Sequence, residues 1–247
     1  MRIMLVRHAE PDYSVDSLTP RGWREAELLS RRLIRLKRVE AFYVSPLGRA
    51  RDTASVTLKK LGASAETLPW LQEFRGRAVD PATGKPRIAW DFPPRLFEAC
   101  PELMLPERWL QTPYFAGTDT PAVWAETKEG MTSLLARHGY APDGVLWRCD
   151  DNRRGVIVLF CHFGIAMAIV GFLTGISPFA LWHATCMAPS SVTTLVSEER
   201  EKGLVWWRCE QIGDVSHLAA ADQRPSTAAQ FPEIYTGRDT TEPIDWD

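Results

Sequence analysis

From Gly155 to Ser197 the chain contains no Asp, Glu, Lys or Arg, and the run from Val156 to Leu173 is almost entirely apolar. By length, such a run could cross a membrane as a helix. Two features instead favour a buried strand, a turn and a helix. Val156–Phe160 is rich in β-branched residues, and Cys161–Gly164 interrupts the run before a series of small residues. The chain therefore has to bury this segment inside a large core, and we expect no membrane partner.

The size and charge of the chain narrow the classes of protein that it could be. Its 247 residues suffice for one large α/β domain with a sizeable core. Lys plus Arg number 29 and Asp plus Glu number 31, which gives a net charge of −2 and no general affinity for nucleic acid. Five cysteines are dispersed without a CxxC pair, which is typical of a reducing compartment and gives no zinc signature.

The amino-terminal apolar run spans only Ile3 to Val6 and ends in Arg7 and His8. It is too short for the apolar core of a signal peptide. We therefore expect a cytoplasmic protein.

Strand-like runs alternate with helix-like segments along the chain. Helix signals include Thr19 as the N-cap before Pro20, and Gly62 after the second helix. We expect strands at 2–6, 41–44, 64–68, 156–160, 191–196 and 204–211, and helices at 19–36, 49–61, 120–138 and 165–174. This order predicts an α/β fold with a doubly wound, mostly parallel sheet, helices on both faces and an antiparallel edge hairpin that turns at 198–203.

Two segments differ from this alternation. Residues 75–120 combine many Pro residues with many large aromatic side chains, which is typical of an ordered insertion with short helices rather than a linker. After Asp214 the sequence is polar and has no period. We therefore predict a single domain over 1–214, with a helical lid insertion at about 75–120, and a carboxyl-terminal tail over 215–247 that lies on the surface or is partly disordered.

Reactive residues follow several of the predicted strands. Arg7 and His8 follow the first strand, Arg49 comes shortly after the second, Glu73 after the third and His162 after the fourth. In open α/β sheets, ligands bind at the carboxyl ends of the strands. If these strands are neighbours, two arginines and two histidines meet in one crevice, with a carboxylate beside them.

This set of side chains matches the chemistry of phosphoryl transfer. Guanidinium and imidazolium groups match the charge and the oxygens of a phosphate dianion. A neutral histidine is a competent nucleophile, and a carboxylic acid can protonate the departing oxygen. A lone His or Arg after a strand is usually a packed or solvated residue, but four such residues at three strand ends are much less likely to occur by chance.

The motifs that carry these residues resemble those of the histidine phosphatase superfamily, also called phosphoglycerate mutase-like. The motifs are Arg7-His8-Ala9-Glu10, Leu18-Thr19 with Gly22, Ser45-Pro46-Leu47-Gly48-Arg49-Ala50 with Thr53-Ala54, Leu71-Gln72-Glu73, and Cys161-His162-Phe163-Gly164. They occur in the family's order, and the resemblance covers about residues 1 to 210. It implies a doubly wound sheet and an insertion after the third strand that forms a lid and selects the substrate.

The resemblance also implies a role for each matched residue. His8 would be the nucleophile that becomes phosphohistidine, and Glu73 would be the proton donor and then the base for water. Arg7, Arg49 and His162 would hold the phosphoryl oxygens, without a metal or another cofactor. Two departures concern the motifs themselves, because Ala9 stands where the family usually has Gly, and Phe163 where it often has Gly or Ala.

Three functions remain open at this point. The first is a metal-independent phosphomonoesterase that acts on a small-molecule phosphate ester. The second is a phosphoglycerate mutase. The phosphatase branch of the family is favoured over the mutase, because residues 11–13 read Pro-Asp-Tyr and residues 74–76 read Phe-Arg-Gly, unlike the mutase motifs. The third is a non-catalytic module that binds a phosphorylated ligand. The substrate and the oligomeric state stay open, with a homodimer as one option.

Other residues of the same types are alternatives to these candidates or have structural roles. Glu10 and Glu66 are alternatives to Glu73 as the acid, and Ser45 is a candidate for supporting the site. We expect most tryptophans to be core, although Trp90 and Trp109 could face the substrate. Structural roles are expected for His138, for His183, with pocket lining as its alternative, and for Cys161 as a small buried residue, whereas His217 lies in the tail.

Overall fold

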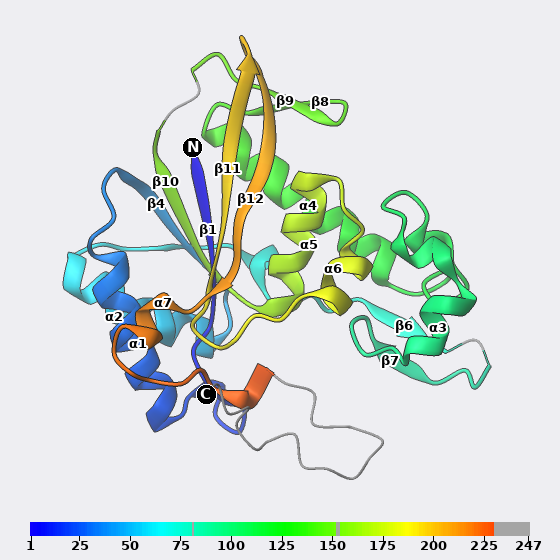
Figure 1. Cartoon of the computed structure of the whole chain (residues 1–247), viewed down its shortest axis with the longest axis horizontal. Helices are drawn as coiled ribbons and strands as arrows, with labels where there is room; N and C mark the ends of the chain where they lie inside the picture. The colour runs from blue at the N-terminus through cyan, green and yellow to red at the C-terminus, as the bar shows by residue number, and fades with distance from the viewer. Residues whose placement is uncertain (81, 152–153, 230–247) are drawn as a thin grey trace.

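The computed structural model describes residues 1–80, 82–151 and 154–229. A central eight-stranded sheet organises these residues (Figure 1). In spatial order its strands are β5 (Glu66–Thr67), β4 (Val39–Val44), β10 (Val156–Cys161), β1 (Arg2–Arg7), β11 (Val192–Glu201), β12 (Leu204–Asp214), β9 (Leu146–Arg148) and β8 (Ala141–Asp143). From β5 to β1 the neighbours are parallel, and from β1 onward they are antiparallel. The predicted fold class is confirmed.

Helices pack against both faces of the sheet (Figure 1). One face carries α1 (Pro20–Leu33) and α2 (Gly48–Leu61), and the other carries α4 (Thr120–Arg137) and α5 (Phe163–Thr174). The shorter helices are α3 (Pro94–Ala99), α6 (Pro178–Ala184) and α7 (Ser216–Ala219), and single 3₁₀ turns cover Pro69–Leu71, Pro101–Met104, Trp109–Gln111 and Thr227–Ala229. No helix within the described ranges is both long and apolar enough to cross a membrane.

Strand β1 lies in the middle of the sheet because its apolar side chains alternate between two cores. Met4 and Val6 pack with α1 and α2, whereas Ile3 and Leu5 face the core under α4 and α5. Strand β10 is buried along its whole length, as a central parallel strand requires. These two strands pair residue by residue, ending with Arg7 opposite Cys161, so their carboxyl ends lie side by side.

The inserted segment 75–120 contains a small hairpin, β6 (Arg77–Val79) and β7 (Pro86–Ile88), followed by α3 and two 3₁₀ turns. It extends beyond α5 and α6 (Figure 1). Its aromatic residues form a continuation of the main core, because Trp109 meets Trp182 edge-on and Phe92 meets Phe179 edge-on. The insertion is thus fixed to the helix that follows the buried β10–α5 unit.

Several local predictions were wrong. The β11–β12 hairpin is not at the sheet edge, because β9 and β8 lie beyond β12. Its turn is also shorter than 198–203, because β11 continues to Glu201 and β12 begins at Leu204, leaving Gly203 with φ of +76° in the turn. The charged residues there belong to the strands, where Glu198 pairs with Arg208 across the ladder at 2.7 Å. Helix α6 and the β8–β9 hairpin were not predicted, because both are short and lack a clear apolar period.

Residues 215–229, the described part of the predicted tail, turn back beside α1 through α7 (Figure 1). Ser226 and His217 in this segment are buried. Residues 230–247, which the tail prediction also covers, lie outside the described part of the chain.

Candidate active site

Two neighbouring segments of the sheet hold His8 at the end of β1. Its backbone N–H donates to Cys161 O on β10 at 2.9 Å, and its carbonyl accepts from the Ser190 N–H, just before β11, at 3.0 Å. Its side chain is buried. The imidazole therefore projects from a backbone that is fixed on both sides, as a reacting group requires.

The hydrogen bond of the His8 ring sets its tautomer. Nδ1 lies 2.8 Å from Ala9 O, and because a carbonyl only accepts, Nδ1 must carry the proton. Nε2 then carries a lone pair. Burial, followed by the charge of Arg7, lowers the pKa of His8 to about 3, so the ring is neutral at physiological pH.

Arg7 and Arg49 supply two buried or nearly buried cations. Arg7 donates through Nη1 to Met187 O, while Arg49, the second residue of α2, pairs through Nη1 with Asp16 Oδ1 at 2.6 Å. In both arginines Nε is buried and has no hydrogen-bond partner among the described residues. Burying an N–H group without a hydrogen-bond acceptor is unfavourable. The two Nε–H groups are therefore positioned to donate to the acceptor oxygens of a ligand.

His162 adds a third unpaired donor beside His8. Its ring lies 5.1 Å from the His8 ring between centroids, and Nε2 lies 2.7 Å from Ser45 Oγ. Ser45 Oγ also accepts the Leu47 N–H at 3.2 Å, which leaves its own proton free to be donated to His162 Nε2. Nδ1 of His162 then carries the ring proton and is buried without a partner in the described chain.

The charge assigned to His162 from the sequence needs correction. Phosphate binding by an imidazolium was expected there. Instead, burial, followed by the nearby His8, Arg49 and Arg7, lowers the pKa of His162 well below its ordinary value. The ring is therefore a neutral N–H donor, and the positive charge around His8 comes from Arg7 and Arg49.

Glu73 joins this group from the segment after β5. Its Oε1 accepts the Phe74 N–H at 2.8 Å and the Ile165 N–H, in the first turn of α5, at 3.1 Å. Burial raises the pKa of Glu73, although these hydrogen bonds and Arg7 oppose the change. Gly164 leaves room for this carboxylate, because a Cβ there would lie 2.7 Å from Glu73 Oε1 and 2.4 Å from the Trp90 ring.

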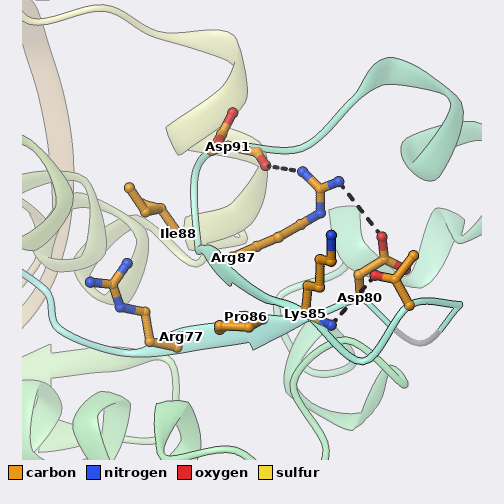
Figure 2. A pocket seen from close by; sticks show the side chains of 8 residues that line it. Arg77, Asp80, Lys85, Pro86, Arg87, Ile88 and Asp91 are labelled. Carbon is orange, nitrogen blue, oxygen red and sulfur yellow. Dashed lines mark hydrogen bonds and ion pairs between the residues drawn. The ribbon is translucent and has the colours of Figure 1, made fainter.

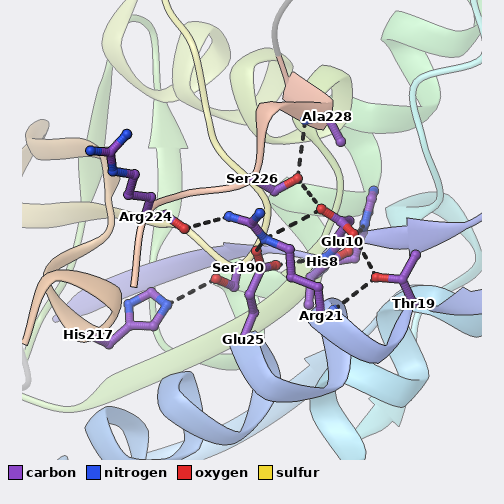
Figure 3. A network of polar contacts seen from close by, with 12 residues as sticks. His8, Glu10, Thr19, Arg21, Glu25, Ser190, His217, Arg224, Ser226 and Ala228 are labelled. Carbon is purple, nitrogen blue, oxygen red and sulfur yellow. Dashed lines mark hydrogen bonds and ion pairs between the residues drawn. The ribbon is translucent and has the colours of Figure 1, made fainter. Parts of the chain in front are cut away.

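The two alternative acids are engaged elsewhere. Glu66 lies on β5 and forms an exposed ion pair with Arg137 at 2.5 Å. Glu10 accepts hydrogen bonds from Thr19 and Ser226 and lies 3.6 Å from Arg21 (Figure 3). The structure thus brings together all five residues that the sequence singled out, namely Arg7, His8, Arg49, Glu73 and His162.

Of the two tryptophans that could face a substrate, Trp90 lies near the site and Trp109 does not. Trp90 packs edge-on against Phe163, and its ring lies next to Gly164. The Glu73 carboxylate lies next to the same glycine, so Trp90 forms part of the wall beside Glu73. Trp109 is completely buried in the core of the insertion and does not face a ligand. Phe163 is itself buried rather than placed at a rim.

The remaining histidines and Cys161 have packing contacts. His138 hydrogen-bonds Tyr43 Oη, and His183 bonds the Phe179 carbonyl inside its own helix. His217 is buried, with Nε2 at 3.0 Å from Ser190 Oγ. Cys161 is fully buried, and burial raises the pKa of its thiol. No described cluster of three or more His, Cys, Asp or Glu side chains is arranged to hold a metal ion.

A groove of about 690 Å³ lies along the β6–β7 hairpin of the insertion (Figure 2). Its lining combines cations and carboxylates, with Arg87 at 3.6 Å from Asp80 and donating to Asp91 O. The hairpin begins four residues after Glu73 and ends two residues before Trp90. The residues that line the groove are therefore different from the five candidate site residues.

Sequence reasoning missed several residues that support the site. Asp16 pairs with Arg49, Met187 O accepts from Arg7, and Ser190 holds the His8 carbonyl. Ser190 has φ of +60°, which is unusual for a residue other than Gly. Its hydroxyl and that of Ser226 tie the carboxyl-terminal segment to the loop after His8 (Figure 3). No local motif marks these residues, because each acts across a long sequence separation.

The fold and the arrangement around His8 define an α/β protein whose sheet brings two histidines, two arginines and a carboxylate together. Residues 3–86 match the family model described as histidine phosphatase superfamily (branch 1). No match is found among curated protein sequences. The family-model match covers less than half of the chain, and it agrees with the resemblance that the motifs carry.

Solved structures show the same fold at low sequence identity. A mutant phosphoserine phosphatase of Entamoeba histolytica, in complex with phosphoserine, is 16% identical, with a TM-score of 0.57 over 88% of this chain and 98% of that chain. A mycobacterial glucosyl-3-phosphoglycerate phosphatase is 20% identical, with a TM-score of 0.56 over 85% and 96%. A protein described as mycobacterial hydrolase 2 is 20% identical, with a TM-score of 0.55 over 90% and 97%.

Proposed function

We propose that this protein is a metal-independent phosphomonoesterase that hydrolyses a small phosphorylated molecule through a phosphohistidine intermediate on His8. One observation carries the proposal. Three buried N–H groups without partners in the described chain, Arg7 Nε, Arg49 Nε and His162 Nδ1, surround a neutral histidine. A phosphoryl group has the charge and the oxygens to satisfy all three.

The first chemical step follows from the protonation states. The lone pair of His8 Nε2 attacks phosphorus, and the bond from phosphorus to the ester oxygen breaks. Glu73, which burial keeps protonated to a higher pH than usual, gives its proton to the departing alkoxide. Arg7, Arg49 and His162 Nδ1 donate to the equatorial oxygens, where charge accumulates. The products are an alcohol, phosphohistidine and the Glu73 carboxylate.

The second step restores the enzyme. The Glu73 carboxylate takes a proton from water, whose oxygen attacks the phosphorus of phosphohistidine. The bond from Nε2 to phosphorus breaks, and inorganic phosphate leaves. His8 is neutral again and Glu73 is again protonated, so one group acts first as acid and then as base. The Nδ1 bond to Ala9 O keeps the ring oriented throughout.

The test compares His8→Ala with His138→Ala, a histidine whose contacts lie away from the site. With p-nitrophenyl phosphate, we expect His8→Ala to abolish phosphate release and His138→Ala to retain it, with circular dichroism confirming that both variants are folded. Rapidly quenched wild-type protein should carry a phosphoryl group that is labile to acid and stable to base. Full activity in His8→Ala would refute the proposal.

A mutase differs from a phosphatase only in the fate of the phosphoryl group. We therefore follow both phosphate release and positional transfer with 2- and 3-phosphoglycerate as substrates. Hydrolysis that outpaces transfer supports the phosphatase. Transfer that is faster than hydrolysis would establish the mutase, and absence of turnover across a broad panel of phosphate esters would favour the binding module.

A further inference from the structure

We infer that Asp16 is a positioning residue that holds the Arg49 guanidinium at the phosphoryl site. This inference rests on the proposed function, because it concerns a group that would bind the phosphoryl oxygens. Asp16 lies in the turn between β2 (Pro11–Asp12) and β3 (Ser17–Leu18), a hairpin that the sequence did not predict.

Both oxygens of the Asp16 carboxylate bind the start of α2. Oδ1 lies 2.6 Å from Arg49 Nη1, and Oδ2 accepts the Gly48 N–H at 2.7 Å. The N-cap residue of α2, Leu47, has no side chain able to cap the helix. Asp16 therefore supplies the cap from a distant part of the sequence, and the same carboxylate fixes the side chain of the next residue.

The backbone is shaped for this contact. Asp16 has φ of +48°, a conformation that Asp and Asn adopt more readily than most residues. A Cβ on Gly48 would lie 2.0 Å from Asp16 O, so only glycine permits the approach. Ser17 Oγ adds a hydrogen bond to Asp52 of α2 at 2.5 Å. The hairpin is thus seated on α2 at several points.

Tyr13 covers Arg49 from the same hairpin. The guanidinium carbon lies 5.4 Å from the centre of the Tyr13 ring, within the range of a cation–π contact. With Asp16 on Nη1 and Tyr13 over the plane, the guanidinium has a fixed orientation while Nε has no partner among the described residues. An arginine that is already ordered loses little side-chain entropy when the phosphoryl group arrives.

The Asp16 carboxylate is charged under working conditions. Burial opposes its ionisation, but the hydrogen bonds from Gly48 and Arg49 outweigh burial and lower the pKa of Asp16. The ion pair therefore persists at neutral pH. Asp16 is partly exposed and touches no group that reacts, so its effect has to pass through Arg49.

A double-mutant cycle separates this role from a general effect on folding. The variants are Asp16→Ala, Arg49→Ala and the two combined, with Asp12→Ala as the matched control. The Asp12→Ala substitution removes the same charge from the same hairpin. The Asp12 carboxylate, however, accepts hydrogen bonds from Ser14 rather than from α2. For each variant we measure kcat and KM for p-nitrophenyl phosphate and the Kd of inorganic phosphate.

We expect Asp16→Ala to lower kcat/KM about tenfold or more, and to weaken phosphate binding in the same direction, because two directly contacting groups are usually coupled. In the Arg49→Ala background, the same change should have an effect of less than about twofold. Asp12→Ala should resemble wild type. Asp16→Asn keeps an acceptor for Gly48 and tolerates the positive φ, so it should recover part of the loss.

Equal effects of Asp16→Ala with and without Arg49 would overturn the inference, as would equal effects of Asp16→Ala and Asp12→Ala. If Asp16→Ala fails to fold, the same cycle is made with Asp16→Asn. If wild-type protein releases no phosphate from any ester, the proposed function fails, whereas the phosphate Kd values still decide whether Asp16 acts through Arg49.

Discussion

At the scale of single residues, burial shifts the pKa values of His8 and Glu73, the nucleophile and the acid of the proposed mechanism, in opposite directions. It lowers the pKa of His8 to about 3 and raises the pKa of Glu73, because it disfavours the charged form of each. Both groups are consequently biased toward their neutral forms. The proposed mechanism uses a neutral imidazole as the nucleophile and a neutral carboxyl as the acid, so one physical cause would prepare both reactants.

Replacing the acid should affect substrates according to their leaving group. In Glu73→Gln, we expect kcat for an alkyl phosphate to fall about 10²- to 10⁴-fold, because the alkoxide needs a proton. p-Nitrophenolate needs none, so its first step should survive. The second step still lacks its base, and stopped-flow measurements should show a burst of p-nitrophenolate followed by a slow phase.

Glu66→Gln is the control, since Glu66 pairs with Arg137 at the sheet edge. It should retain wild-type kinetics with both substrates. Equal losses for the alkyl and the aryl ester in Glu73→Gln, without a burst, would show that Glu73 is not the proton donor.

At the scale of elements, α1 contains a fully buried carboxylate that supports the loop after His8. Glu25 Oε2 accepts the Glu10 N–H at 2.9 Å, and Arg21 Nε lies 3.3 Å from Oε1 (Figure 3). Burial nevertheless raises the pKa of Glu25 from 4.5 to about 6. Between these two values the folded state binds more protons than the unfolded state, so this group's contribution to stability falls as the pH rises.

The prediction concerns the pH dependence of the free energy of unfolding. Relative to Glu25→Gln, wild type should lose about 2 kcal/mol as the pH rises from below 4.5 to above 6, from about 1.4 kcal/mol per pKa unit. Urea unfolding at several pH values measures the difference, in which other titrating groups cancel. A pH-independent difference between wild type and Glu25→Gln would contradict the prediction.

The elements that the sequence predicted share a physical property. Long or fully buried elements such as β1, β10 and α4 impose a clear apolar pattern, and their bounds are confirmed within about one residue. Short elements, including α6 and the β2–β3 hairpin, are held by tertiary contacts that leave no local period. The sequence therefore predicted the layers but not the hairpin that contacts Arg49.

The same distinction applies to the site. Arg7, His8, Arg49, Glu73 and His162 follow strands in recognisable motifs, so their meeting could be predicted. Asp16, Ser190 and Ser226 are ordinary polar residues in the sequence, and their contacts with Arg49, His8 and Glu10 exist only in the folded chain. What the sequence could not provide is therefore the support of the reacting groups rather than the groups themselves.

At the scale of the whole molecule, the carboxyl-terminal segment closes onto the beginning of the chain. Ser226 Oγ donates to the Glu10 carboxylate, and Arg21 Nη2 donates to Arg224 O at 2.6 Å (Figure 3). His217, in the same segment, bonds the Ser190 hydroxyl, and the Ser190 N–H holds the His8 carbonyl. The described carboxyl-terminal segment thus contacts the loop after His8 and the start of α1.

Because of these contacts, we expect the Ser226→Ala substitution both to loosen residues 215–229 and to lower kcat. A hydrogen bond to a charged group contributes about 1.5–3 kcal/mol, so amide hydrogen exchange in 215–229 should become markedly faster. If the segment fixes Glu10 and hence His8, kcat should fall several-fold while KM changes little, because the phosphoryl donors are untouched. Ser55→Ala, an exposed change on α2, is the control and should alter neither quantity. Faster exchange with unchanged kcat would show that the segment packs on the nucleophile loop without positioning it.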